Sequence, residues 1–97
     1  MITIAGIEYG MNFVSAGNYK PATGFFNVWT ICEPGKKNSW YNLARAYAFD
    51  EQNDKAIIAL EKAVRNGFNN KELISNDLAF KFILTDKRFI KLMMSIK

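Results

Sequence analysis

The chain has 97 residues, of which 49% are hydrophobic, 14% aromatic and 23% charged, a composition that predicts one soluble, folded domain over residues 1–97. It contains no histidine and a single cysteine, Cys32, which excludes histidine-based catalytic and metal sites, an internal disulfide and a thiolate zinc site. The net charge is +4, and the whole excess lies in residues 81–97, because residues 1–80 carry equal numbers of basic and acidic side chains.

The beginning of the chain lacks the features of a targeting segment. Residues 1–6 have neither the basic start nor the long apolar stretch of a signal peptide. No stretch of about 18 uncharged apolar residues occurs, so a membrane span is not expected. The cellular compartment stays open, since an exported parent protein could have lost its signal.

Two helices are predicted in the first third of the chain. The first covers about residues 4–16 and stops at Gly17, which suits a left-handed helix end. The second opens near Pro21, has its interior at residues 22–32, and ends before Pro34. The apolar face of the first helix consists of Ile4, Ile7, Met11 and Val14.

Two further helices follow at the same spacing. We expect Asn38 or Ser39 to cap the third helix, and Asn53 or Asp54 to cap the fourth. Gly67 is expected to end the fourth helix in a left-handed conformation. Helix-period apolar positions in these segments are Trp40, Leu43, Ala44, Tyr47, Ile57, Leu60 and Val64.

The last third predicts a closing segment. Residues 72–84 are expected to form two short pieces, and a final helix is expected to begin near Asp86. Its apolar side chains recur at helical spacing, whereas the basic side chains fall mostly on the wetter side. The apolar set is Phe89, Leu92, Met93 and Ile96, and the basic set is Lys87, Arg88 and Lys91.

The chain also repeats itself at a period of about 34 residues. Small residues fall on small ones, as Ala22 on Ala56, and large apolar residues fall on large ones, as Phe26 on Leu60. The second unit carries a set of small and large apolar residues at fixed spacing: Trp40, Leu43, Ala44, Tyr47, Ala56, Leu60 and Ala63. This pattern resembles the tetratricopeptide repeat, a helix-turn-helix unit in which the alanines let two helices approach closely.

The first unit matches this pattern more loosely, with Gly6, Tyr9 and Trp29 at positions where other residues are usual, and Phe68 replaces a common proline. Residues after the second unit resemble the closing segment of some tetratricopeptide proteins. That part of the pattern comprises Asn66, Gly67, Phe68, Leu73, Asp77, Leu78, Leu84, Asp86, Arg88, Phe89 and Leu92.

The resemblance implies an all-α, right-handed helical stack. Repeat one would span about residues 3–36, repeat two about 37–70, and the closing helices about 71–97. Relatives with this ending often carry the module at the C-terminus of a larger bacterial chain, including secreted esterases and processing peptidases. The resemblance implies a role in binding and no catalysis or cofactor.

Repeat proteins of this kind bind partners on the concave face, lined by the first helix of each hairpin. The predicted partner-binding residues are therefore Glu8, Asn12, Ser15, Tyr41, Asn42, Arg45 and Phe49. Tyr41 and Phe49 would supply aromatic anchors, and Arg45 a charged fork. The alternative is that these side chains face solvent or the closing helices, which can fill the groove of so short a stack.

The N-terminal edge offers a second candidate surface. It begins with apolar Ile2, Ile4 and Ile7 and carries Trp29, whereas the C-terminal side has a cap. An uncovered apolar edge predicts a contact with an upstream domain of the same chain or with a second copy.

The leading functional prediction is a non-catalytic module that binds a protein or peptide. The alternative is a C-terminal accessory domain of a larger enzyme of esterase, hydrolase or peptidase type. Nucleic-acid binding is disfavoured because the basic cluster lacks interleaved exposed aromatics. Asp50, Glu51 and Asp54 lack the glycine and distal glutamate of a calcium loop, and Cys32 is expected to be a small buried hydrophobic residue.

Overall fold

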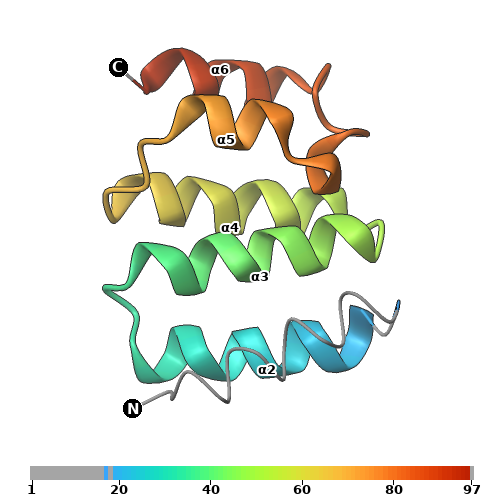
Figure 1. The fold of residues 1–97 in the computed structure, drawn as a ribbon, viewed down its shortest axis with the longest axis vertical. Coiled ribbons are helices and arrows are strands. Elements are labelled where there is room, and N and C mark those ends of the chain that lie inside the picture. The colour runs from blue at the N-terminus through green and yellow to red at the C-terminus, as the bar shows by residue number, and fades with distance from the viewer. Residues whose placement is uncertain (1–16, 18, 97) are drawn as a thin grey trace.

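The computed structural model describes residue 17 and residues 19–96, and within them the protein is all-α, as the sequence predicts (Figure 1). The predicted first helix, residues 4–16, lies outside the described residues. The elements are α2 (Tyr19–Cys32), α3 (Lys37–Phe49), α4 (Asn53–Arg65), α5 (Lys71–Asn76), the short 3-10 helix η1 (Leu78–Phe80) and α6 (Lys87–Ser95).

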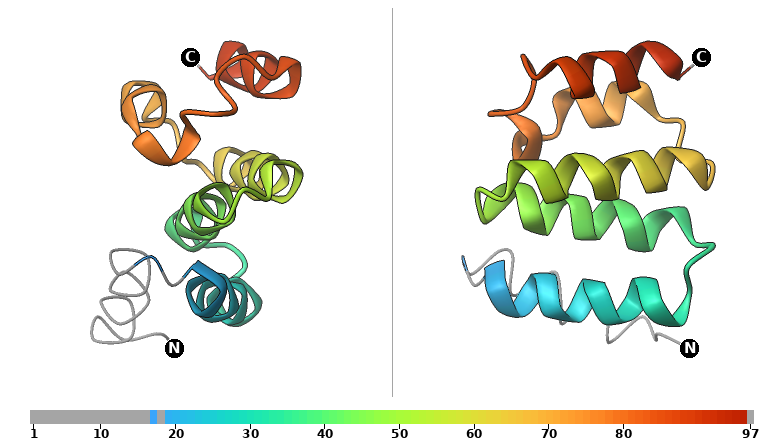
Figure 2. Two further views of the ribbon diagram at one scale, coloured as in Figure 1. Left: turned by 90° about the vertical axis from the view of Figure 1, so that its right-hand side faces the viewer. Right: turned by 180° about the vertical axis from the view of Figure 1, so that it is seen from behind.

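The helices stack in chain order and alternate between two layers. Seen along the helices, α3 and α5 lie on one side and α2, α4 and α6 on the other (Figure 2). The most extensive packing joins α3 to α4 and α2 to α3. The antiparallel hairpin of α3 and α4 thus occupies the centre, with α2 below it and the closing segment above it in Figure 1.

Small residues form the centre of this packing. Ala44, Ala56 and Ala63 are all fully buried, together with Ile57 and Leu60. Because alanine has no side chain beyond Cβ, the backbones of α3 and α4 approach closely, and the larger side chains fill the space around the contact. The expected burial of these alanines is confirmed.

Two helix ends use a left-handed residue. At the end of α4, Gly67 has φ of 104°, the Gly67 amide donates to the Val64 carbonyl at 3.0 Å, and the Phe68 amide donates to the Ala63 carbonyl at 2.9 Å. This pair of bonds is a Schellman cap, and it confirms the predicted end at Gly67. At the end of α3 the corresponding residue is Glu51, with φ of 60°, a conformation that favours glycine.

The predicted N-caps of α3 and α4 are wrong. Helix α3 begins earlier, with Lys36 as its N-cap and no side-chain cap bond. The reason is the preceding turn, in which the buried Ser39 hydroxyl donates to the Lys36 carbonyl at 2.7 Å instead of accepting from the helix. The N-cap position of α4 is Gln52, which makes no side-chain cap bond, and the Asp54 carboxylate accepts from Arg88 instead.

The prediction that Cys32 is buried is also wrong, since the thiol is exposed at the end of α2. Helix α2 buries the side of Ala22, Phe26 and Trp29. Cys32 lies six residues after Phe26, which places it about 120° round the helix from that side. The apolar character of Cys32 alone did not show on which side of α2 the residue lies.

The closing segment has the predicted form. Two short pieces, α5 and η1, precede α6, which begins directly after Asp86. The Asp86 carboxylate accepts from the Arg88 amide at 2.9 Å and so caps α6. Of the predicted apolar set, Phe89, Met93 and Ile96 are buried, and Leu92 is partly buried against the core.

Candidate functional site

The seven predicted concave-face residues divide into two groups. Glu8, Asn12 and Ser15 lie outside the described residues. The other four lie on α3: Tyr41, Asn42, Arg45 and Phe49. Tyr41 and Asn42 are buried, while Arg45 and Phe49 are partly exposed.

Tyr41 is enclosed by the closing segment. Its ring stacks on Phe68 with centroids 4.1 Å apart, and the Phe80 ring meets it nearly edge-on at 5.8 Å. Its hydroxyl donates to Asp77 Oδ2 at 2.6 Å. Burial raises the pKa of Tyr41 above its usual range, and the bond to the Asp77 carboxylate raises it further.

Arg45 reaches the same carboxylate. Its Nε donates to Asp77 Oδ2 at 2.7 Å, and its guanidinium carbon lies 5.7 Å from the centroid of the Phe49 ring. The other oxygen, Asp77 Oδ1, accepts from the Ala79 amide at 3.0 Å and caps η1. We call the set Tyr41, Arg45 and Asp77 the Asp77 junction.

Phe49 and Asn42 make local contacts. The Phe49 ring stacks on Tyr19 of α2 with centroids 5.4 Å apart, and Asn42 Nδ2 donates to the Asn38 carbonyl within α3. The structure therefore brings Tyr41 and Arg45 together on Asp77. For these two residues it agrees with the alternative that the predicted concave-face side chains face the closing segment. The closing pattern in the sequence included Asp77, but nothing in the sequence indicated that Tyr41 and Arg45 would bind it.

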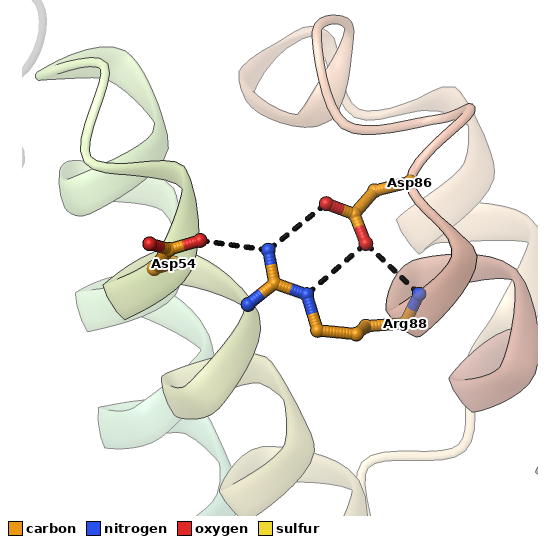
Figure 3. Close-up of polar contacts among 3 residues, drawn as sticks. All are labelled: Asp54, Asp86 and Arg88. Carbon is orange, nitrogen blue, oxygen red and sulfur yellow. Dashed lines mark hydrogen bonds and ion pairs between the residues drawn. The ribbon is translucent and has the colours of Figure 1, made fainter.

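A second polar cluster joins the closing segment to the hairpin (Figure 3). Arg88 Nη2 donates to Asp54 Oδ1 at 2.7 Å and to Asp86 Oδ2 at 2.9 Å, and Arg88 Nε donates to Asp86 Oδ1 at 3.2 Å. We call Asp54, Asp86 and Arg88 the Arg88 junction. The side chain and then the backbone amide of Arg88 hold the pKa of Asp86 below its usual range.

Two acidic residues near the α3–α4 turn already have side-chain partners. Asp50 Oδ2 accepts from Gln52 Nε2 at 2.6 Å, and Asp54 belongs to the Arg88 junction. Over residues 19–96, no group of three or more Cys, Asp or Glu is arranged to hold a metal ion.

Exposed apolar side chains gather at the two ends of the described stack. Helix α2 exposes Val28 and Ile31, whereas Trp29, expected on the uncovered edge, is buried and donates to Glu33 Oε2 at 2.7 Å. In the central hairpin, Ile58 is the exposed large apolar residue. The closing segment exposes Leu73, Leu78, Phe82, Leu84, Ile90 and Met94.

Comparisons of the chain with protein-family models, with curated proteins and with solved structures found no match. Among the helices described, none is long and apolar enough to cross a membrane.

Proposed function

We propose that this protein is a non-catalytic interaction module that binds a protein partner or a neighbouring domain through the outer face of α2. The observation that carries the proposal is the exposure of two large aliphatic side chains on that face. Ile31 is 77% exposed and Val28 is 54% exposed, although they lie three residues apart on the same helix side.

The two sides of α2 show why this exposure is informative. Ala22, Phe26 and Trp29 are buried on the side of α2 that faces the core. Val28 and Ile31 lie exposed on the other side, so they add no buried apolar contact to the fold. Burying an aliphatic side chain of this size contributes about 1.5–3 kcal/mol. A partner that covered both Val28 and Ile31 would therefore gain binding free energy from two buried aliphatic side chains.

The resemblance to tetratricopeptide repeats supports the same proposal. The buried alanines of the α3–α4 hairpin agree with the close helix contact of that repeat, and such repeats serve as binding modules that need cover at their ends. Under this proposal the outer face of α2 is the binding surface, and the Asp77 junction holds the closing segment in place.

Cys32 provides a test, because it is the only cysteine and is exposed beside Ile31 at the end of α2. A photocrosslinking maleimide attached to Cys32 is expected to crosslink to a second copy, to a neighbouring domain or to a cellular partner. The products are identified by mass spectrometry. The additional substitution Ile31→Asp is expected to abolish the crosslink.

A matched control moves the label elsewhere. In the variant Cys32→Ser with Asn76→Cys, the label lies on the exposed end of α5. The same crosslinked products from both positions, or no product from Cys32 that depends on Ile31, would count against the proposal.

A further inference from the structure

A groove lies on the side of the stack formed by α2, α3 and α4. Its volume is about 250 Å³. Its lining combines aromatic, aliphatic and basic side chains: Trp40, Leu43, Tyr47, Lys55, Ile58 and Lys62. None of these residues belongs to the Asp77 junction or to the outer face of α2.

The two aromatic rings of the groove are held in place by hydrogen bonds. Trp40 Nε1 donates to the Pro34 carbonyl at 2.7 Å, and the Tyr47 hydroxyl accepts from Asn27 Nδ2 at 2.7 Å. The walls of the groove are therefore set by the fold before any ligand arrives, which reduces the ordering cost of binding.

Each ring also carries a lysine. Lys62 Nζ lies 4.7 Å from the centroid of the Trp40 ring, and Lys55 Nζ lies 5.8 Å from that of the Tyr47 ring. In the part of the chain that the structure describes, the ion pairs involve Arg45 and Arg88, and neither lysine has a carboxylate within pairing distance. The groove therefore has two lysine ammonium groups, each over an aromatic ring, that can donate hydrogen bonds to an anion.

We propose that this groove binds an acidic peptide segment that places an apolar side chain between two carboxylates. The apolar side chain would contact Leu43 and Ile58, the latter half exposed, and the carboxylates would pair with Lys55 and Lys62. The inference goes beyond the proposed function, because it assigns the protein a second binding surface, separate from the outer face of α2, and names the chemistry of its partner.

The spacing of the lysines sets the spacing of the carboxylates. Lys55 and Lys62 are seven residues apart on α4, a rise of about 10 Å along the helix. Alternate side chains of an extended peptide share a face, so an apolar side chain with an acidic one two positions before it and another two positions after it presents all three to the groove. The two carboxylates are then about 13 Å apart, a span that the flexible lysine side chains can meet.

The dimensions and the rings favour a peptide over other anions. The groove volume of about 250 Å³ lies below the usual range for small-molecule pockets, about 300–1,000 Å³, and suits a single peptide side chain. A nucleic-acid base would have to displace Lys62 or Lys55 to stack on the ring faces of Trp40 and Tyr47 that these lysines approach. Residues 1–80, which contain the groove, also carry no net charge to attract a phosphate backbone.

The test uses the full chain and a short end-capped, fluorescent peptide in which a leucine has one glutamate two positions before it and another two positions after it. Binding is measured by fluorescence anisotropy and located by amide and indole NMR shifts. We expect the Trp40 indole signal to move and the Trp29 indole signal to stay, since Trp29 is buried and bonded to Glu33. A peptide with glutamines in place of both glutamates is expected to bind more weakly.

Paired variants sharpen the test. Lys55→Gln with Lys62→Gln is expected to weaken peptide binding about three- to tenfold, because two exposed ion pairs are removed. The control Lys71→Gln with Lys87→Gln removes the same charge from exposed sites on α5 and α6, and is expected to leave binding unchanged. Circular dichroism verifies that each variant folds.

Three results would overturn the inference. These are no peptide binding up to about 1 mM, equal losses in the two double variants, and a short single-stranded oligonucleotide that binds more tightly than the peptide and shifts the same signals. Ile31→Asp leaves the groove intact, so peptide binding is expected to survive it. A failed peptide with a successful Cys32 crosslink would therefore overturn this inference alone.

Discussion

The two junctions that attach the closing segment to the hairpin use the same chemistry in different surroundings. At the Asp77 junction, the acceptor side chain is 8% exposed and receives Tyr41, Arg45 and the Ala79 amide. At the Arg88 junction, the Arg88 side chain is 50% exposed and that of Asp54 is 82% exposed. Both contain an arginine and a carboxylate at 2.7 Å.

Geometry alone therefore does not rank the junctions. Water screens a pair that it surrounds, so exposed ion pairs contribute little, whereas a buried carboxylate that loses its donors keeps its full desolvation cost. The Asp77 junction should therefore contribute most of the polar stabilisation that holds the closing segment on the hairpin, and the Arg88 junction should contribute less. The following substitutions test this difference, from the largest expected effect to the smallest.

Asp77→Ala should have the largest effect. It removes the acceptor for Tyr41 and Arg45 and the cap of η1, and it leaves the Tyr41 hydroxyl buried without its partner. We expect the free energy of unfolding to fall by about 2–4 kcal/mol, measured by urea denaturation. A loss no larger than that of Asp86→Ala would contradict the ranking.

Tyr41→Phe should have an intermediate effect, about 1–2 kcal/mol, because it removes one hydrogen bond to a carboxylate and keeps the stack on Phe68. The folded-state pKa of Tyr41 is raised, so its contribution to stability is fully present below the unfolded value, about 10, and is lost as the pH rises above it. The gap between wild type and variant should accordingly narrow in alkaline urea titrations. A gap independent of pH would argue against the Asp77 bond.

Asp86→Asn should have a smaller, acid-sensitive effect. Asparagine can still cap α6, so the substitution removes mainly the charge that meets Arg88. The pKa of Asp86 is lowered in the folded protein, so its contribution is present above the usual aspartate value, about 3.9, and is lost as the pH falls through the lowered value. Thermal melts of wild type and variant should therefore converge in acid, and a constant difference would oppose this assignment.

Asp54→Asn should have the smallest effect, since this carboxylate is the most exposed member of either junction. The change should destabilise less than Tyr41→Phe and should vanish in about 1 M sodium chloride, where the Debye length is about 3 Å. Tyr41→Phe in the same salt serves as the buried control. If the loss of stability in Asp54→Asn did not depend on salt, the Arg88 junction would be shielded from solvent like the Asp77 junction, and the ranking would fail.

The sequence predicted the helical elements of the described region well because their signals are local. Pro21 and Pro34 marked the ends of α2, Gly67 marked the end of α4, and Asp86 marked the start of α6. Errors arose where the side chain of a good N-cap residue has another partner. Ser39 and Asp54 are good N-cap residues by type, but the neighbouring turn and Arg88 use their side chains differently.

The candidate surfaces were less predictable, since they depend on residues far apart in the sequence. Tyr41 was predicted as an anchor from its helix position, but its neighbour Asp77 lies 36 residues away. Likewise, the groove needs Trp40 and Tyr47 of α3 to meet Lys62 and Lys55 of α4. Helical spacing shows which residues share a face, but it does not show what that face meets.

By itself, the sequence determined an all-α chain without histidine chemistry, the bounds of most helices to within a residue or two, and the alanines that allow α3 and α4 to touch. Only the tertiary structure decided that Tyr41 faces inward, that Cys32 faces outward, and that two lysines stand over aromatic rings beside a groove. The physical reason is that backbone hydrogen bonding and apolar periodicity act within one element, whereas burial and charge pairing depend on which elements come together.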